Sequence, residues 1–142
     1  MDLAIAGRLS ARLLLTLVWL AAGSMDGNAL AAEAVTLEPG QDGVQRGTIE
    51  LDDVYTPRHI VVQGGKPVEL VLKSLTTITP HNFILDDPAA GIKVEQEVGA
   101  GKTETVRFTP PKPGVFVFYC DKKLLFFKSH REKGMEGRLE VR

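Results

Sequence analysis

The sequence predicts an all-β domain, folded as an antiparallel two-sheet sandwich or small barrel of about eight strands. Three observations support this fold class. From residue 47 onward, apolar and polar residues alternate with a period of two over short runs. Turns that contain glycine or proline separate these runs, as at Gly64-Gly65 and Asp86-Asp87-Pro88. No long stretch has the apolar spacing of an amphipathic helix.

The alternation gives the position of each strand along the chain. The predicted strands are residues 47–51, 58–62, 67–73, 81–85, 93–98, 102–109, 114–120 and 137–141. Residues 32–47 have no clear period and lead into the first strand. The strand pattern lapses over residues 121–133, where a short helix or helical turn is expected.

The same alternation predicts which side chains point into the core. Phe116, Phe118 and Cys120 share one face of their strand, and the two phenylalanines mark it as the core face. His81 lies on the side of Phe83, so it is also expected to point inward. Cys120 and His81 should therefore lie at strand ends near one pole of the sandwich. By the same rule His59 faces outward if Ile60 and Val62 are inward, and it is predicted to be a surface residue.

Residues 1–31 have the pattern of a cleaved secretory signal peptide. Arg8 and Arg12 precede an uncharged, mainly apolar stretch over residues 13–25, which is shorter than the roughly 20 residues that span a bilayer. The small-residue sequence Ala29-Leu30-Ala31 is typical of a cleavage site. An uncleaved membrane anchor and a buried helix are the alternatives. Cleavage after Ala31 leaves residues 32–142 as one domain in the periplasm or another exported location, with no stable membrane span.

Composition excludes several classes of site and partner. The chain has 142 residues, one Cys, three His and a net charge of −1, so its overall charge attracts neither nucleic acid nor anionic lipid. Any binding must then depend on a local surface. A single Cys excludes an internal disulfide, a four-cysteine zinc site and an iron–sulfur cluster held by this chain alone. Metal coordination is one reason for an unpaired Cys120 in an oxidising compartment.

Four side chains form a candidate metal site. Cys120, His130 and Met135 lie on one segment between two predicted strands, and His81 comes from an upstream strand. Two imidazoles, a thiolate and a thioether are the donor set of a mononuclear blue-copper site, which is trigonal with a weak axial methionine. Thiolate and thioether favour Cu(I), and imidazole suits both oxidation states.

From about Val54 to Val141 the chain resembles the cupredoxin family of small blue copper proteins, whose members include plastocyanin, azurin and rusticyanin. The matching motifs are Pro57, Ile60-x-Val62, Gly65, the strand Val68 to Leu72, His81-Asn82-Phe83, Pro113-Gly114, and Phe118-Tyr119-Cys120 followed by His130-x3-Gly134-Met135-x-Gly137-x-Leu139-x-Val141. The resemblance implies a cupredoxin-like Greek-key β-sandwich. It also implies copper as the cofactor, with one ion held by His81, Cys120, His130 and Met135.

The segment between Cys120 and His130 departs from the family pattern. It has nine residues, which is longer than in the small electron-transfer members. The fourth ligand is therefore left open between Met135 and a nearby carboxylate. The candidate carboxylates are Asp121, Glu132 and Glu136.

Two polar residues and one apolar run have alternative interpretations. Asn82 either braces the segment after Cys120 or is an ordinary strand asparagine, and Ser129 is a weaker candidate for the same role. Leu124-Leu125-Phe126-Phe127 forms either a minor core or an exposed docking patch. Residues 121–133 carry five cationic and two anionic side chains, a charge of +3, which would suit an acidic redox partner such as a cytochrome or an oxidoreductase.

The predicted function is that of an exported type 1 copper protein, which carries single electrons between redox partners and is not an enzyme. A copper store, chaperone or sensor is the first alternative. A chaperone more often has a methionine- or histidine-rich tract, whereas Met135 is the one methionine that signal cleavage would leave. A copper site with an open or carboxylate-ligated position for enzyme-like chemistry is the second alternative, and a sandwich with a vestigial site is the third.

Overall fold

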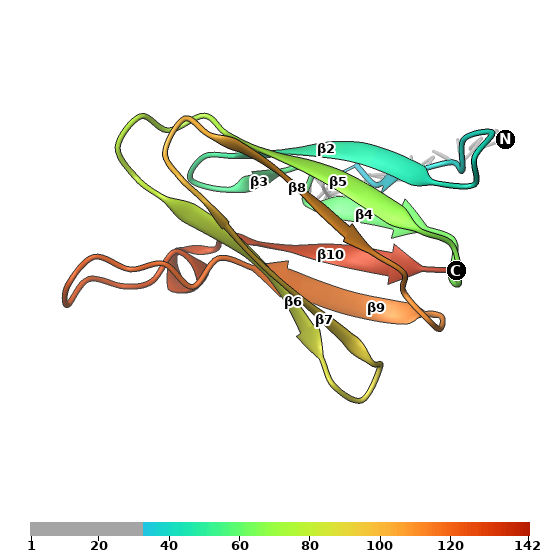
Figure 1. The fold of residues 1–142 in the computed structure, drawn as a ribbon. Coiled ribbons are helices and arrows are strands. Elements are labelled where there is room, and N and C mark those ends of the chain that lie inside the picture. Colours follow the sequence, from blue (N-terminus) through green and yellow to red (C-terminus); the bar gives the residue numbers. More distant parts are fainter. Residues whose placement is uncertain (1–32) are drawn as a thin grey trace, which may run out of the picture.

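The computed structural model describes residues 33–142, which form two β-sheets packed face to face (Figure 1). Ten strands and one 3₁₀ turn make up this part of the chain. Their bounds are β1 Val35–Thr36, β2 Gln45–Leu51, β3 Tyr55–Thr56, β4 His59–Val62, β5 Val68–Ser74, β6 His81–Asp87, β7 Ile92–Val98, β8 Thr103–Phe108, β9 Gly114–Tyr119, η1 Arg131–Lys133 and β10 Glu136–Val141. The predicted signal peptide, residues 1–31, lies outside the described residues. Within residues 33–142 no helix has the length and apolar character needed to cross a bilayer.

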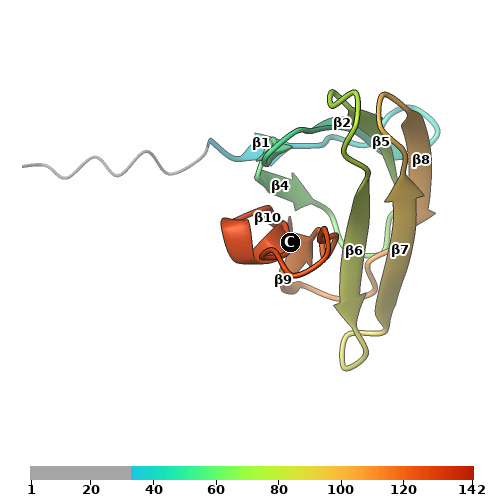
Figure 2. The same ribbon diagram turned by 90° about the vertical axis from the view of Figure 1, so that its left-hand side faces the viewer.

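The predicted all-β sandwich is confirmed, but its sheets are mixed rather than antiparallel throughout. One sheet has the order β1-β4-β10-β9-β6-β7, and the other has the order β3-β2-β5-β8. The β1–β4, β4–β10 and β2–β5 pairs are parallel, and the remaining pairs are antiparallel. Figure 2 shows the two sheets as separate layers rather than a closed barrel. The sequence did not predict the parallel pairs, because a period of two is the same for either strand direction.

All eight predicted strands are present, with ends that differ by a few residues from those expected. The additional strands β1 and β3 have two residues each, too few to show any alternation. The expected helical turn in residues 121–133 is the 3₁₀ turn η1.

The core lies between the sheets. Phe116 and Phe118 of β9 are buried while Val115 and Val117 are exposed, as the alternation predicts. In β6, by contrast, residues 81–85 are all buried, so alternation does not separate the two faces of this strand. One reason is that β6 has its inner face on the core while the segment after Cys120 covers part of its other face through Asn82.

A cluster of three aromatic rings supports the end of the sandwich where β6 begins. The ring centroids of Tyr55 and Phe83 each lie 5.1 Å from that of Phe118, and they lie 6.2 Å from each other. All three side chains are fully buried. Such tightly packed rings make a rigid base for whatever side chains lie above them.

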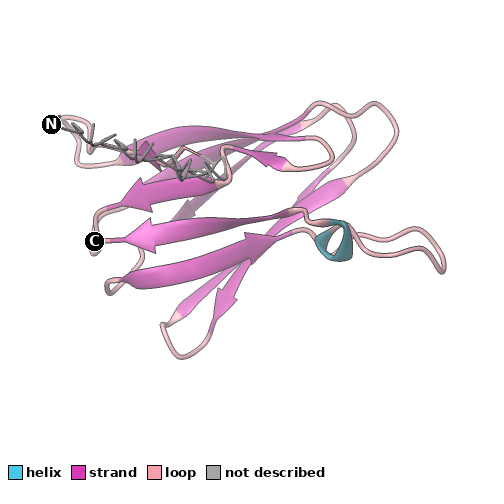
Figure 3. Ribbon diagram, turned by 180° about the vertical axis from the view of Figure 1, so that it is seen from behind, coloured by secondary structure: helices cyan, strands magenta, loops and turns pink. Residues whose placement is uncertain are grey.

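The strand directions bring one particular set of chain segments to this pole. Because β9 is antiparallel to both β6 and β10, the end of β9 lies beside the beginnings of β6 and β10. Figure 3 shows η1 and a long loop at the same end of the molecule. The predicted donor residues all lie in these segments.

Candidate metal centre

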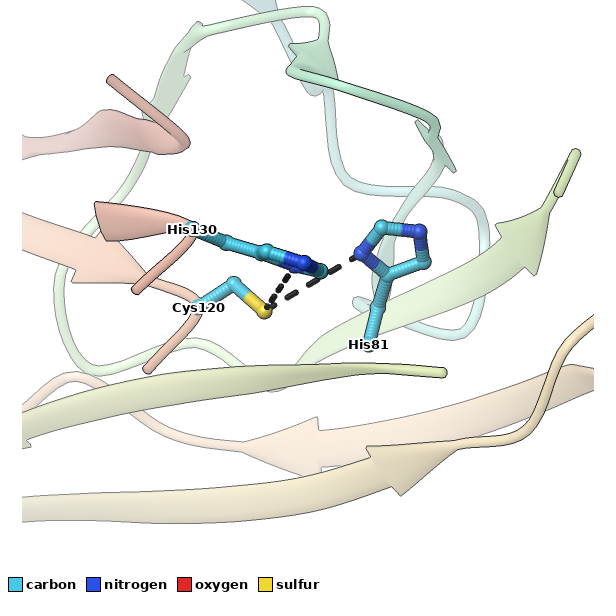
Figure 4. A group of neighbouring side chains, drawn as sticks. All are labelled: His81, Cys120 and His130. Atoms are coloured by element: carbon cyan, nitrogen blue, oxygen red, sulfur yellow. Dashed lines mark hydrogen bonds between the residues drawn. The ribbon is translucent and has the colours of Figure 1, made fainter. Parts of the chain in front are cut away.

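Three predicted donor side chains meet at the pole of the sandwich. His81 is the first residue of β6, Cys120 directly follows β9, and His130 directly precedes η1. The Cys120 Sγ atom lies 3.4 Å from His130 Nδ1 and 4.0 Å from His81 Nδ1 (Figure 4). A donor atom from each of the three residues lies within 4.8 Å of the other two, so a single cation fits among them.

Burial differs among the three residues. His81 and Cys120 are buried, with exposed fractions of 2 % and 0 %, whereas His130 is only partly buried. The two imidazole rings face one another with centroids 5.0 Å apart and planes tilted by 49°. His130 is thus the side of the cluster that meets solvent.

Met135 is held close to these residues through the backbone. It is fully buried and directly precedes β10. The Cys120 N–H donates to the Met135 carbonyl (3.2 Å), and the Met135 N–H donates to the His130 carbonyl (2.9 Å). Gly134, which has a φ of 97°, ends η1 and lets the chain turn into Met135.

Of the two interpretations of Asn82, the brace on the segment after Cys120 is confirmed. Its backbone N–H donates to Cys120 Sγ (3.4 Å), and its side-chain amide exchanges two hydrogen bonds with Asp121. The Asn82 carbonyl in turn accepts a hydrogen bond of 2.6 Å from the buried hydroxyl of Tyr55. Asn82 therefore joins the aromatic base, the sulfur atom and the start of the long segment in one network.

The role considered for Ser129 is wrong. Its backbone N–H and hydroxyl form hydrogen bonds of 2.7 and 3.2 Å with Glu132, one turn later, so Ser129 stabilises the start of η1 rather than the segment at Cys120. The carboxylate of Glu136 forms an ion pair with Arg131 at 3.6 Å. The three carboxylates considered as ligands, including Asp121, thus each have another partner in the described chain.

Burial shifts the protonation of all three donors toward their neutral forms. It lowers the pKa of His81, and the neighbouring His130 lowers it further; burial also lowers the pKa of His130. Burial raises the pKa of the Cys120 thiol, although the N–H groups of Asn82 and Lys122 oppose the shift. A cation that binds here would displace a proton from the Cys120 thiol, whereas both imidazoles are neutral already and need lose no proton before they coordinate it.

The sequence did not identify the polar surroundings of the imidazoles. A cavity of about 430 Å³ lies beside them, lined by Asp52, Asp53, Val54, Thr76, Thr79, His81, His130 and Lys133. The Nε2 atom of His81 is buried and has no hydrogen-bond partner among the described residues. An Asp-Asp pair ahead of a buried tyrosine was the one signal available in the sequence, and nothing in its spacing pointed to the histidines.

His59 is not a free surface residue, which corrects the sequence prediction. Its side chain is 19 % exposed, and its Nε2 atom lies 3.0 Å from a carboxylate oxygen of Glu140. This pairing arises because β10 runs parallel beside β4, a neighbour that alternation along β4 does not reveal. His59 does not belong to the cluster of donor atoms.

A family model described as "Cupredoxin-like domain" matches residues 13–135 of this chain. No curated protein matches it in sequence. Among solved structures, the metal-binding domain of a Cu(I)-exporting P-type ATPase from Streptococcus pneumoniae is similar, with 22 % identity, a TM-score of 0.57 and coverage of 78 % of this chain and 97 % of that one. Dithionite-reduced auracyanin from Roseiflexus castenholzii has 21 % identity and a TM-score of 0.57, with coverage of 72 % and 99 %. Auracyanin A, a "blue" copper protein from Chloroflexus aurantiacus, has 19 % identity and a TM-score of 0.57, with coverage of 70 % and 100 %. At these identities the structural likeness shows the fold.

Proposed function

Because the chain belongs to the cupredoxin-like domain family, we propose that it holds one copper ion through His81, Cys120 and His130, with Met135 as a weak axial ligand, and acts as a one-electron carrier. The observation that carries the proposal is the convergence of two imidazole nitrogens and one thiol sulfur within 4.8 Å of one another. This donor set is that of the blue-copper electron-transfer sites.

The donor residues suit copper because the sulfur is a soft ligand and because the two imidazoles are held in their neutral form. The thiolate of Cys120 favours Cu(I), and neutral imidazoles serve both oxidation states. When bound, copper supplies a one-electron couple between Cu(II) and Cu(I). The three carboxylates considered as ligands, those of Asp121, Glu132 and Glu136, each have another partner, which favours the thioether of Met135 over any of them.

The surroundings of the donors suit a carrier because they resist rearrangement. Cys120 is held by hydrogen bonds at its own N–H and at its sulfur, and His130 by a bond of 2.7 Å from its N–H to the Lys122 carbonyl. A site whose donors keep their positions reorganises little when an electron arrives or leaves. His130, the partly exposed donor, is the edge through which we propose that electrons pass to and from another redox protein.

Copper storage or delivery is a second candidate function. The observation that favours it is the similarity of the fold to the metal-binding domain of a Cu(I) exporter and to a solution structure of a "copper binding protein in the apo form", the latter at 22 % identity and a TM-score of 0.57. A copper enzyme is less favoured. The Cu-containing nitrite reductase from Thermus scotoductus is similar at 19 % identity and a TM-score of 0.51, but the match covers only 28 % of that chain.

Visible absorption and electron paramagnetic resonance of the chain titrated with Cu(II) test the proposal. We expect one equivalent of copper, a strong thiolate-to-copper charge-transfer band and narrow hyperfine splitting. Cys120→Ser should abolish the band, whereas the matched control His59→Gln should keep it, because His59 lies outside the donor cluster. Met135→Leu should retain the colour and raise the reduction potential, because it removes only the weak donor.

The same samples separate the candidate functions. Fast, reversible reduction and reoxidation by a redox protein supports the carrier. Tight Cu(I) binding with no reversible Cu(II) state would instead support storage or delivery. Absence of stoichiometric copper, or copper without a thiolate band, would refute both the ligand set and the carrier role.

We also infer that the chain is exported, from the signal-like pattern of residues 1–31. Cell fractionation of a strain that expresses the full chain, with mass spectrometry of its N-terminus, tests this. The expected product begins at Ala32.

A further inference from the structure

Four consecutive apolar residues are exposed at the pole that carries the metal centre. Leu124, Leu125, Phe126 and Phe127 have exposed fractions of 69 %, 67 %, 93 % and 61 %. Figures 1 and 3 show their loop projecting beyond η1, away from both sheets. Of the two sequence interpretations, the minor core is therefore wrong, and the exposure that a docking patch requires is confirmed, while docking itself stays a prediction. We call these four residues the apolar tip.

Backbone hydrogen bonds fix the conformation of the loop that carries the apolar tip. At its base, the N–H of His130 donates to the carbonyl of Lys122 (2.7 Å) and closes the loop. At its end, the N–H of Phe127 donates to the carbonyl of Leu124 (3.0 Å), and Leu125 has a φ of 50°, in the left-handed region. A turn with these bonds keeps the intervening side chains at the outermost point of the loop.

A second loop enlarges the apolar surface near His130. Ile78 is 87 % exposed and lies in the segment between β5 and β6. It lines a hollow of about 190 Å³ together with Thr79, Pro80, Lys122, Lys123, Leu124 and His130. Apolar side chains and the two lysines thus lie together between the tip and the partly buried donor of the metal centre.

Cations lie at the base of the loop, and none lies within the tip. Lys122 and Arg131 are engaged with Glu97 and Glu136, whereas no ion pair is formed by Lys123, Lys128 or Lys133 within residues 33–142. Lys123 and Lys128 directly flank the apolar tip on either side. The whole chain has a net charge of −1, so this positive charge is a local feature.

We propose that this loop binds the surface of an anionic lipid bilayer, with the apolar tip in the interfacial region and Lys123, Lys128 and Lys133 at the headgroups. Apolar groups that bind at a bilayer interface are buried by only about 5–10 Å, so a short projecting turn suffices to place them there. Lys and Arg close to an anionic surface add attraction that falls off within a Debye length.

A bilayer fits this surface better than a protein partner does. The tip projects from the molecule, and 93 % of Phe126 is exposed to water, so a binding partner would have to surround nearly the whole side chain in order to bury it. A protein would need a matching pocket to cover it, whereas fluid lipid closes around any shape. The binding places His130 beside the membrane surface, and it does not depend on whether copper is bound.

Vesicle flotation tests the proposal, with protein recovered from the exported fraction of cells so that all variants share one N-terminus. We expect wild-type protein to float with vesicles of equal parts phosphatidylglycerol and phosphatidylcholine, and to float much less with pure phosphatidylcholine. The double variant Leu125→Ser/Phe126→Ser should bind anionic vesicles about tenfold less or weaker still, because it removes the two apolar side chains at the centre of the turn.

Two further variants separate the contributions. Lys123→Glu/Lys128→Glu should lose the preference for anionic vesicles, and added salt should weaken the wild type in the same way. Val115→Ser is the matched control, because Val115 is 61 % exposed but lies at the start of β9, at the far end from the loop. It should float as the wild type does.

Three results would overturn the proposal. One is wild-type protein that stays unbound with anionic vesicles, and another is equal flotation of the wild type and the tip variant. The third is a tip that mediates self-association in light scattering, or binding to an acidic redox protein, more strongly than it binds vesicles. The copper charge-transfer band of each variant is recorded alongside: a normal band without vesicle binding refutes this proposal alone, and vesicle binding without a band refutes the copper carrier alone.

Discussion

Replacing Asn82 by alanine should detach the segment after Cys120 from β6. The Asn82 amide donates to a carboxylate oxygen of Asp121 (2.8 Å) and accepts from the Asp121 N–H (3.1 Å), and the residue is 2 % exposed. A hydrogen bond to a charged group contributes about 1.5–3 kcal/mol, and a neutral one about 0.5–1.5 kcal/mol. Asp121 itself is exposed, so water replaces part of what it loses. We therefore expect the free energy of unfolding to fall by about 1–3 kcal/mol.

Urea unfolding of the metal-free protein measures this loss. The matched control is Gln96→Ala on the neighbouring strand β7, whose amide bonds only to the adjacent Glu97 carbonyl at an exposed position. It should cost less than about 0.5 kcal/mol. The N–H that donates to Cys120 Sγ belongs to the backbone, so Asn82→Ala should keep the copper charge-transfer band. A loss no larger than that of the control would show that the amide pair does not hold the segment.

Two other predictions concern the pH dependence and the packing of the metal-free protein. Folding lowers the pKa values of His81 and His130 from 6.5, so the unfolded chain binds more protons than the folded chain does below pH 6.5. The urea midpoint of unfolding should therefore fall as the pH drops from 7.5 to 5.5. If the midpoint of His81→Gln had the same pH dependence as that of the wild type, this reasoning would be contradicted. Gly137→Ala should lower the free energy of unfolding by about 1–3 kcal/mol in the same assay, because the added Cβ would overlap the ring of Phe118 and lie 2.7 Å from a backbone oxygen. The control Gly99→Ala should have a much smaller effect, because its Cβ would contact only a flexible lysine side chain.

The strands were predictable because they are long enough to alternate. In β9 the buried and exposed side chains follow the pattern seen in the sequence, and Cys120 continues its buried face. In β6 the alternation does not distinguish the inner face from the outer one, since five consecutive residues are buried. The inward position of His81 was inferred correctly, although Asn82 beside it is buried as well.

The candidate donors were predictable from residue type and order, but their supports were not. Nothing in the sequence joins Asn82 to Asp121, or Tyr55 to the carbonyl of Asn82, because these contacts cross between strands and loops far apart in the chain. The same holds for His59, whose carboxylate partner lies on a parallel neighbouring strand. Alternation reports the two faces of one strand and carries no information about what lies beside it.

The amino-acid sequence by itself determined the fold class, the residues able to donate to a metal, and the apolar and cationic composition of the loop between Cys120 and His130. These depend on local periodicity and on side-chain chemistry, which are properties of the chain alone. Only the tertiary structure decided that two imidazoles and a thiol meet within 4.8 Å, and that the four apolar residues face outward. Both outcomes depend on the antiparallel placement of β9 between β6 and β10 and on the backbone bonds that close the loop, which exist only once distant segments have packed together.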